Sequence, residues 1–528
     1  MRYSTPGVYI ERLDRNPQRI GLRRTDVGGF VGVAARGPLH TPVKVESWRQ
    51  YTSVFGDRTA VGYLAWAVAG YFENGGRTCW VVRAADPEQA RPARIRLLVN
   101  GEGPYVLEAG SPGAWGNDIE IEAVWGRDRI THLVARTSDE RRQVLDVTSL
   151  AGELPAQRRE NLLGVREEDL PEVTEPPLVH VAPDSHWVPC ERLDARAGRV
   201  RLAGGEDGLA TLRIAHLVGD SDPRSPPWGL AALARIDPVS FVAVPDLMLE
   251  QEPTGAPGAP PGFGDQEIQD AQLEIIANCE RLRDRVAILD LPRRADPSRA
   301  IAHAGALGRS SFAALYFPWI LVSDPLRLRG VVRAIPPSGQ VAGIFARSDR
   351  LRGVHKPPGN EAVEGAHDVT TRLDDASHGR LNDGAVNAIR PIPGRGLLLL
   401  GVRTLDPDLR WRYVNIRRLF AMLEEALNEQ MHWAVFEPNS PRLWGEIERA
   451  VRGYLETLYR RGMLDGATSR EAYFVRCDAS TNPAWETDAG KATCVLGVQP
   501  PFPAEFVIVR IGVTRSGIEI EEKGAHDV

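Results

Sequence analysis

The spacing of apolar and polar residues divides the first part of the chain into short, distinct elements. Residues 27–35 (VGGFVGVAA) have the pattern of a strand interrupted by glycines, and residues 63–72 (YLAWAVAGYF) that of a compact apolar helix. Asn74-Gly75-Gly76 is typical of a helix end, because glycine adopts a left-handed cap without strain. Residues 79–83 (CWVVR) then indicate a buried strand.

The pattern changes near residue 87 and stays different up to about residue 236. Short alternating segments such as IRLLV, YVLEA and DIEIEAVW follow one another, separated by glycine, proline and charged runs. Strands of this length with frequent turn signals are typical of a β-sandwich. We therefore predict that residues 87–236 form a β-rich domain inserted into a core domain.

Strand and helix patterns alternate after the predicted insertion. Residues 241–245 and 286–291 read as strands, and residues 265–283 and 297–307 read as helices. This alternation favours a parallel sheet covered by helices. The predicted apolar face of the helix at 265–283 consists of Ile268, Leu273, Ile276 and Leu282.

Two longer helices follow. The segment 414–433 has an apolar stripe of helical period from Ile416 to Met431, and Arg417 and Arg418 lie off that stripe, on its polar side. The second helix, within residues 440–462, begins with Ser-Pro, which suits an N-cap and a first helical position, and ends in Arg-Arg-Gly.

Both chain ends are β-prone but have too little apolar content to form a core of their own. The strand-forming residues are Val8, Tyr9 and Ile10 near the start and Phe506, Val507, Ile508 and Val509 near the end. Unpaired strands need a sheet edge, so we expect extended arms. The predicted divisions are an N-terminal arm (1–22), a first part of the core (23–86), the insertion (87–236), a second part of the core (237–504) and a C-terminal strand or arm (505–528).

Composition supports a globular chain of several domains. At 528 residues the chain exceeds the ~250–300 residues at which single cores stop growing. No apolar run approaches the ~20 residues needed to cross a bilayer, and the N-terminus does not read as a secretory signal, so we expect a protein folded in the cytosol. The net charge of −6 gives no nucleic-acid signature, and five scattered cysteines without CxxC support neither a disulfide framework nor a zinc site.

Three aspartates are the first candidates for chemistry. Asp246, Asp290 and Asp324 each follow a strand-like segment, and the carboxyl ends of strands are where sites of α/β sheets usually lie. They could form a carboxylate cluster, or each could cap the turn or helix that follows it. Ser310 and Ser311 lack a nucleophile motif, and the chain has no GxSxG, HExxH or GxxxxGK[ST] sequence.

Histidines and an acidic segment provide weaker candidates. His303, His355, His367 and His378 lie mostly in polar sequence, so we interpret them as surface or loop residues and not as catalytic bases. The segment 365–384 (GAHDVTTRLDDASHGRLNDG) could be a metal loop or a solvated or inter-subunit loop. Its spacing fits no calcium or zinc pattern. No metal or cofactor is expected.

Several blocks, taken in order, resemble the tail sheath proteins of contractile phage tails, R-type pyocins and extracellular contractile injection systems. The resemblance covers about two thirds of the chain, and residues 87–235 depart from it. The blocks are PGVYIE at 6–11, GFVGVAARGP at 29–38, SWRQYTSVFG at 47–56, YLAWAVAGYFENGGRTCWVVR at 63–83, IPPSGQVAGIFARSDRLRGVHKPPGN at 335–360 and VNIRRLFAMLEEALNEQMHWAVFEPN at 414–439.

This resemblance implies an α/β core of subtilisin-like type with a mixed sheet and flanking helices, an outward-facing insertion, and arms that add strands to neighbouring subunits. It also implies a non-enzymatic polymer that surrounds an inner tube and contracts. Implied partners are copies of the chain, the tube protein, baseplate and terminal cap proteins, and optionally a second sheath paralogue, with no nucleic acid and no membrane insertion. The particle would assemble in the bacterial cytoplasm, and it could be a phage tail, a bacteriocin or an injection system.

Two alternatives stay open from the sequence. Arg417 and Arg418 could contact the inner tube, or they could be solvated or paired with nearby acidic residues. The chain as a whole could also be a soluble α/β hydrolase-like enzyme with a β insertion, an alternative that the absence of nucleophile motifs disfavours.

Overall fold

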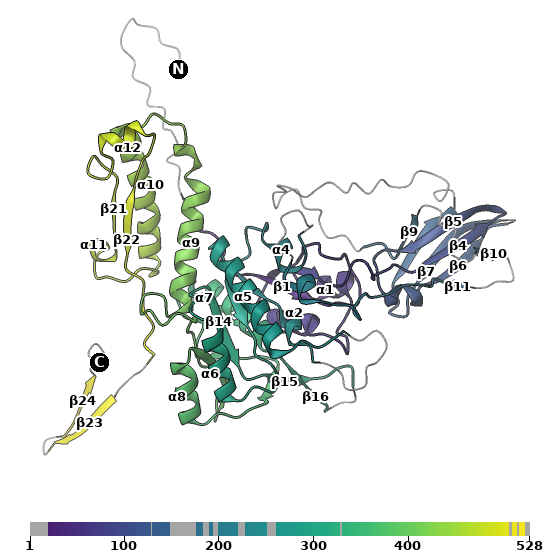
Figure 1. Ribbon diagram of the computed structural model, residues 1–528, viewed down its shortest axis with the longest axis horizontal. Coiled ribbons are helices and arrows are strands. Elements are labelled where there is room, and N and C mark those ends of the chain that lie inside the picture. The colour runs from purple at the N-terminus through teal and green to yellow at the C-terminus, as the bar shows by residue number, and fades with distance from the viewer. Residues whose placement is uncertain are drawn as a thin grey trace, which may run out of the picture. The chain divides into compact units, whose positions relative to one another are not determined.

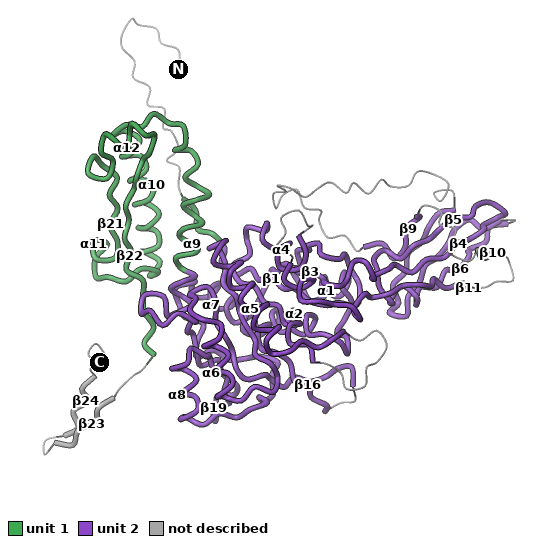
Figure 2. The backbone as a smooth tube through the Cα atoms, viewed as in Figure 1, with its two compact units in different colours: residues 1–23, 419–528 green, residues 24–418 purple. Residues whose placement is uncertain are grey.

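The chain forms two compact units, one of residues 1–23 and 419–528 and the other of residues 24–418 (Figure 2). We call them unit 1 and unit 2, and the division falls within helix α9 (Val414–Gln430). The computed structural model describes residues 20–127, 129–147, 176–182, 190–193, 199–219, 227–250, 260–327, 330–505, 509–514 and 517–522.

Unit 2 is built on a nine-stranded mixed sheet (Figure 1). Six neighbouring strands, from β19 to β3, are parallel, and antiparallel strands lie at both edges. The central strands are buried along their whole length, as expected for a sheet covered on both faces. The strand order is β17 (Glu361–Ala362), β20 (Gly396–Leu399), β19 (Val386–Ile392), β14 (Ala313–Phe317), β13 (Val286–Leu289), β12 (Phe241–Ala243), β1 (Val27–Gly32), β3 (Thr78–Arg83) and β2 (Val43–Val45).

Helices cover the two faces of this sheet. Phe30 of β1 and Phe241 of β12 contact Tyr71 of α2 (Leu64–Glu73), and Phe241 also contacts Phe345 of α7 (Ser338–Arg352). On the opposite face of β1, a side chain at position 29 would meet Leu233 of α4 (Gly229–Leu233). The other helices of unit 2 are α1 (Trp48–Phe55), α3 (Ile214–Val218), α5 (Asp265–Leu282), α6 (Pro297–Ala306) and α8 (Asp375–Asp383).

Small residues allow α2 and α7 to approach closely. A Cβ atom added at Gly339 would lie 2.3 Å from the Cα atom of Ala67, and one added at Gly343 would lie 2.5 Å from the carbonyl oxygen of Tyr71. Such distances are far inside van der Waals contact, so α7 can pack here only because these positions lack side chains.

The β-rich part of unit 2 has an apolar core of its own. Its two four-stranded sheets share one buried cluster that includes Ile95, Leu107, Ile121 and Leu133. In β4 the buried and partly buried positions alternate, as a half-buried strand requires. The sheet orders are β10 (Cys190–Leu193), β4 (Arg94–Val99), β5 (Glu102–Ala109), β9 (Val179–Ala182), and β11 (Arg199–Arg201), β6 (Glu120–Trp125), β7 (Ile130–Arg136), β8 (Arg142–Asp146).

The chain leaves the nine-stranded sheet after β3 and returns beside its own outgoing segment. The amide of Arg91 donates to the carbonyl of Glu206 at 2.9 Å, and the amide of Arg94 donates to that of Ala203 at 2.8 Å. Arg83, fully buried at the end of β3, donates to the carbonyls of Gly37 at 2.9 Å and Pro112 at 2.7 Å. These bonds tie the β-rich part to the nine-stranded sheet.

A three-stranded antiparallel sheet completes unit 2. Its order is β16 (Val332–Ile335), β15 (Ile320–Ser323) and β18 (Ala366–Val369). The hairpin of β15 and β16 carries exposed apolar side chains at Leu326, Val331 and Val332.

Unit 1 combines two long helices, most of α9 and all of α10, with shorter helices and two small sheets. Helix α10 (Pro441–Arg460) buries one stripe of side chains and packs against β21 (Tyr473–Arg476), which pairs with β22 (Val495–Val498). Near the chain start, Arg23 forms an ion pair with Glu429 at 2.5 Å. The remaining elements are η5 (His432–Ala434), α11 (Ser469–Ala472), α12 (Ala484–Asp488), and the paired strands β23 (Val509–Thr514) and β24 (Gly517–Glu522).

Several details differ from the sequence predictions. Leu273 is exposed, and α5 instead buries Ile275 and Ile276 beside Ile268. The segment 365–384 is mainly strand β18 and helix α8 and not a loop. Asp374 stabilises the start of α8 as its N-cap, since its side chain accepts the amide N–H of Ser377 at 2.7 Å. Among the described residues, no helix has the length and apolar character needed to cross a bilayer.

Candidate functional site

Asp246 lies at the carboxyl end of β12 and is completely buried. It accepts the amide N–H of Val33 at 2.7 Å and that of Tyr63, which begins α2. Burial raises the pKa of Asp246 to about 6, while these hydrogen bonds oppose the shift. Gly32 is required beside it, since a Cβ atom there would lie 2.1 Å from the carboxylate. Asp246 therefore anchors the end of β1 to the start of α2.

Asp290 plays the same part at the end of the neighbouring strand β13. Its carboxylate accepts the amide N–H of Ser338, the first residue of α7, at 2.9 Å, and its carbonyl accepts the Gln272 amide at 2.7 Å. Burial raises the pKa of Asp290 to about 7. The first N–H groups of a helix have no acceptor within the helix. Asp290, which follows β13, supplies an acceptor for the first residue of α7.

Asp324 is not part of this edge. It follows β15 in the three-stranded sheet and accepts the amide N–H of Leu326 at 3.0 Å. All three aspartates thus cap backbone groups, which was one of the two alternatives from the sequence. Within the described ranges, no group of three or more His, Cys, Asp or Glu side chains is arranged to hold a metal ion.

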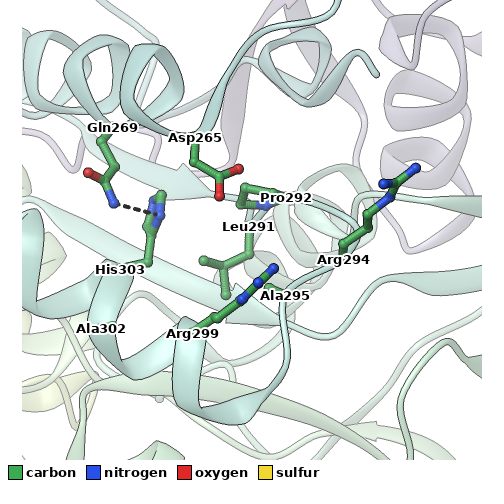
Figure 3. A pocket seen from close by; sticks show the side chains of 9 residues that line it. All are labelled: Asp265, Gln269, Leu291, Pro292, Arg294, Ala295, Arg299, Ala302 and His303. Carbon is green, nitrogen blue, oxygen red and sulfur yellow. Dashed lines mark hydrogen bonds between the residues drawn. The ribbon is translucent and has the colours of Figure 1, made fainter. Parts of the chain in front are cut away.

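A cavity of about 300 Å³ lies between α5 and α6, beside the end of β13 (Figure 3). His303 projects from α6 toward Gln269 of α5, and its Nε2 atom lies 2.6 Å from Oε1 of Gln272. Burial lowers the pKa of His303. The prediction that His303 is a surface or loop residue is wrong, because α6 carries it into the protein. The lining residues are Asp265, Gln269, Leu291, Pro292, Arg294, Ala295, Arg299, Ala302 and His303.

This cavity lacks the parts of a nucleophilic site. Its lining contains no serine, threonine or cysteine, and His303 is held by two glutamine amides rather than by a carboxylate. Ser310 is buried, and its hydroxyl donates to the carboxylate of Glu280 at 2.6 Å and not to a histidine.

A serine and a histidine that the sequence did not pair meet on the three-stranded sheet. Ser323 Oγ lies 2.6 Å from Nε2 of His367, and both residues are exposed. His378 lies on α8 and not in a loop, 3.1 Å from a guanidinium nitrogen of Arg390. His355 follows α7, and burial lowers its pKa. Among the described residues no carboxylate contacts the His367 ring, so the pair lacks the third group of a triad.

Arg417 and Arg418 are buried, so their assignment to an exposed polar face is wrong. Arg418 forms a bidentate ion pair with Asp349 of α7 at 2.5 and 3.0 Å and donates to the carbonyl of Thr25 at 2.7 Å. Its guanidinium also lies over the rings of Phe241 and Phe345, while that of Arg417 lies over Phe312 and Trp411. These side chains fasten the start of α9 within unit 2 and cannot reach a partner surface.

Most residues predicted to form the arms lie in parts of the chain that the structure does not describe. These are Val8, Tyr9, Ile10, Phe506, Val507 and Ile508. Val509 is the first residue of β23, and it pairs with Glu522 of β24. The polar tail GIEIEE, for which no element was predicted, forms β24.

Comparison with known protein families finds two matching domains in the second half of the chain. Residues 256–405 match the family model described as the phage tail sheath protein central domain, and residues 406–514 match that of the phage tail sheath C-terminal domain. Residues 256–514 therefore resemble the tail sheath family. A prophage major tail sheath protein of Pseudomonas aeruginosa is 26% identical over 338 residues, which cover 62% of this chain and 81% of the relative. The tail sheath protein of Salmonella phage ViI is 24% identical over 282 residues, 48% of this chain and 43% of that one.

Solved sheath structures have a fold similar to that of this chain over nearly its whole length. The contracted helical sheath of the anti-feeding prophage covers 97% of this chain and 100% of its own, at 21% identity and a TM-score of 0.58. A crystallised sheath tail protein of Desulfitobacterium hafniense covers 89% and 93%, at 13% identity and a TM-score of 0.57. The relatives are structural proteins and not enzymes, which agrees with the capping roles of the buried aspartates.

Proposed function

We propose that this chain is the sheath subunit of a contractile injection system, which polymerises around an inner tube and contracts to drive the tube through a target envelope. The observation that carries the proposal is the consecutive match of residues 256–514 to the central and C-terminal sheath domains. Likeness of fold to sheaths in the contracted state supports it, including that of an extracellular contractile injection system called PVC, with a TM-score of 0.55. The hydrolase-like alternative is not favoured.

In this proposal the subunits are joined by strand exchange. Unit 1 contains two two-stranded sheets, β21–β22 and β23–β24, and each of their strands has an edge that pairs with no other described strand. Such edges are templates for an added strand. The N-terminal arm (1–22) would supply such a strand to a neighbouring subunit, and the C-terminal arm (505–528), which contains β23 and β24, would take part in the same exchange.

Unit 2 would act as a rigid body that rotates during contraction. Its nine-stranded mixed sheet is compatible with the subtilisin-like core that the sequence resemblance implies. Residues 93–202 would be an insertion on the outward side, since they have their own core and join the sheet through one pair of crossing segments. The end of the predicted insertion (87–236) instead contains α3 and α4, which pack into the core of the nine-stranded sheet. Arms that keep their pairing while unit 2 rotates would hold the polymer together.

The driving free energy would be stored during assembly. A heterologous contact that does not close produces a helical filament, and a small gain in contact free energy per subunit is multiplied along it. The sequence contains no GxxxxGK[ST] loop, in keeping with a contraction that uses no nucleotide.

The proposed partners are further copies of the chain, an inner tube protein, and baseplate and terminal cap proteins. Baseplate association is supported by likeness to a chain in the anti-feeding prophage baseplate, with a TM-score of 0.55. Assembly would occur in the bacterial cytoplasm, before any release of the particle. A second sheath paralogue in the same particle is a further proposed partner.

Negative-stain microscopy of the purified full chain tests this function. We expect striated tubes of uniform width that appear with rising protein concentration. A chain that stays monomeric at high concentration, with intact termini confirmed by mass spectrometry, would overturn the proposal.

A further inference from the structure

Two cysteines, neither of them in a CxxC motif, flank the connection between β21 and β22, at the end of the strand pair that residues 478–493 close. Tyr473 pairs with Val498 and Arg476 with Val495, so the next position in the same register pairs Cys477 with Cys494. The two side chains are close enough to influence each other's pKa. Facing residues of antiparallel strands have Cα atoms ~4.5–5.5 Å apart, which lies inside the ~4.4–6.8 Å range of disulfides.

The segment between the two cysteines is fixed by a buried asparagine. Asn482 accepts the amide N–H of Thr493 at 2.6 Å and donates to the carbonyls of Thr493 and Asp478, each at 3.0 Å. Thr493 precedes Cys494 and Asp478 follows Cys477, so Asn482 holds the neighbours of both cysteines. The thiols therefore need little rearrangement to bond.

The two thiols differ in exposure in the way that a stepwise oxidation needs. Cys494 is partly exposed, whereas Cys477 is buried. Two other cysteines, Cys79 in β3 and Cys279 in α5, are completely buried in the core of unit 2. They serve as internal controls for reactivity.

We propose that Cys477 and Cys494 form a reversible disulfide when the protein is exposed to a small disulfide oxidant. The Cys494 thiolate attacks the oxidant RSSR, which forms a mixed disulfide and releases one RS⁻. The Cys477 thiolate then attacks the Cys494 sulfur and releases the second RS⁻. Each cysteine loses its proton to solvent, the protein is oxidised by two electrons, and RSSR is reduced to two thiols.

The disulfide would close the segment 478–493, including α12, into a covalent loop and fix the hairpin that α10 supports. The protein would then carry a stronger hairpin outside a reducing cytosol than inside it. This inference concerns one chain and does not depend on the sheath function, so the failure of either leaves the other intact.

Burial raises the pKa of Cys494 to about 12, with further contributions from Cys477 and Glu448. Burial also raises the pKa of Cys477. Interactions with Cys494 and Asn482 lower this pKa, whereas the charges of Glu448 and Asp478 raise it further. The thiolate is the reactive form, so oxidation should be slow at neutral pH and needs long incubation.

Peptide mapping of the full chain tests the proposal. The protein is incubated with oxidised glutathione or with dithiothreitol, alkylated during denaturation and digested with trypsin. Cleavage after Arg476, Lys491 and Arg510 puts the two cysteines on separate peptides, 477–491 and 492–510. We expect these peptides to be joined only in the oxidised sample and to separate after reduction, while Cys79 and Cys279 are alkylated in both. Alkylation of Cys477 and Cys494 in the oxidised sample would overturn the proposal.

Single variants test the order of the two steps. Cys477→Ser should leave a persistent glutathione adduct on Cys494, because the resolving thiol is absent. Cys494→Ser should leave Cys477 unmodified, because it is buried. The proposal would also be contradicted if the unaltered protein kept a glutathione adduct on Cys494 and formed no disulfide. That measurement does not depend on the folding of either variant.

Discussion

Each of three buried carboxyl groups in unit 2 has hydrogen-bond or ion-pair partners that offset the free-energy cost of its burial. Asp246 and Asp290 accept main-chain N–H groups, whereas Asp349 is paired with Arg418. An ionised carboxylate without such partners is costly to bury. Each of these side chains therefore links two elements, and its removal should affect stability more than any chemistry.

Asp290 should give the protein a measurable pH dependence. Its folded pKa of about 7 exceeds the ordinary value of 3.8, so its contribution to stability is fully present below about pH 4 and is lost as pH rises through 7. Asp290→Asn keeps an acceptor for Ser338 but cannot ionise. From pH 5 to pH 8, urea unfolding should show the wild type losing roughly 2 kcal/mol relative to this variant.

The matched control for this test is Asp374→Asn. Asp374 is exposed, and hydrogen bonding from Ser377 lowers its pKa, so it is ionised in the folded and unfolded states at both pH values and the difference between wild type and Asp374→Asn should not change. An unchanged difference between wild type and Asp290→Asn at the two pH values would contradict the raised pKa.

Arg418 should contribute far more to the free energy of unfolding than an exposed arginine does. Arg418→Met leaves Asp349 buried without its partner and should lower the free energy of unfolding by about 3–5 kcal/mol. Arg410→Met removes an exposed ion pair with Asp408 and should lower the free energy of unfolding far less. Chemical denaturation of both variants compares them directly, and equal effects would contradict the structural role of Arg418.

Sequence reasoning found the anchoring aspartates but misassigned the arginines. Asp246 and Asp290 follow strands, so their capping role was among the alternatives from the start. The position of Arg417 and Arg418 off the apolar stripe indicated exposure. The helical period does not reveal that aromatic rings and a carboxylate from distant parts of the chain cover that side of α9. The contact between Cys477 and Cys494 was hidden for the same reason, since strand pairing creates it.

At the scale of elements, strong local patterns predicted most of the fold. The strands at 27–32, 78–83 and 286–289 and the helices α5 and α10 lie close to their predicted positions. Helix α7 was not predicted as an element, because its almost complete burial leaves no amphipathic stripe to recognise. The helix contains glycines where α2 approaches, which lower helix propensity further.

The close approach of α2 and α7 gives a prediction at this scale. Gly339→Ala places a methyl group 2.3 Å from the Ala67 Cα atom, so the helices must separate and stability should fall by about 1–3 kcal/mol. Gly305→Ala in α6 meets open space and should raise stability by about 0.5–1 kcal/mol. Thermal unfolding compares the two variants, and a neutral Gly339→Ala would show that the helices are not tightly packed.

At the scale of the whole molecule, a sheath subunit needs a stable body and separate means of attachment. Unit 2 provides the body through its nine-stranded sheet and buried core. Unit 1 carries the small sheets whose open edges we assign to strand exchange. The sequence predicted arms at 1–22 and 505–528 and a core that continues to residue 504, whereas residues 419–504 belong to unit 1. It also did not predict the pairing of β21 with β22 or of β23 with β24.

Deletion of residues 1–15 should separate folding from assembly. The deleted residues include Val8, Tyr9 and Ile10, and no described contact of either unit involves them. The truncated chain should keep its thermal unfolding temperature but form no ordered tubes in the electron microscope. Normal sheaths from this variant would show that the N-terminal arm does not join subunits.

Helical reconstruction by cryo-electron microscopy of tubes assembled from the full chain tests the central claim most directly. The account predicts a helical lattice in which Val8 to Ile10 or Phe506 to Val509 of one subunit pairs with a strand edge in unit 1 of another. Tubes in which both chain ends fold back on their own subunit, with no strand shared between subunits, would contradict it.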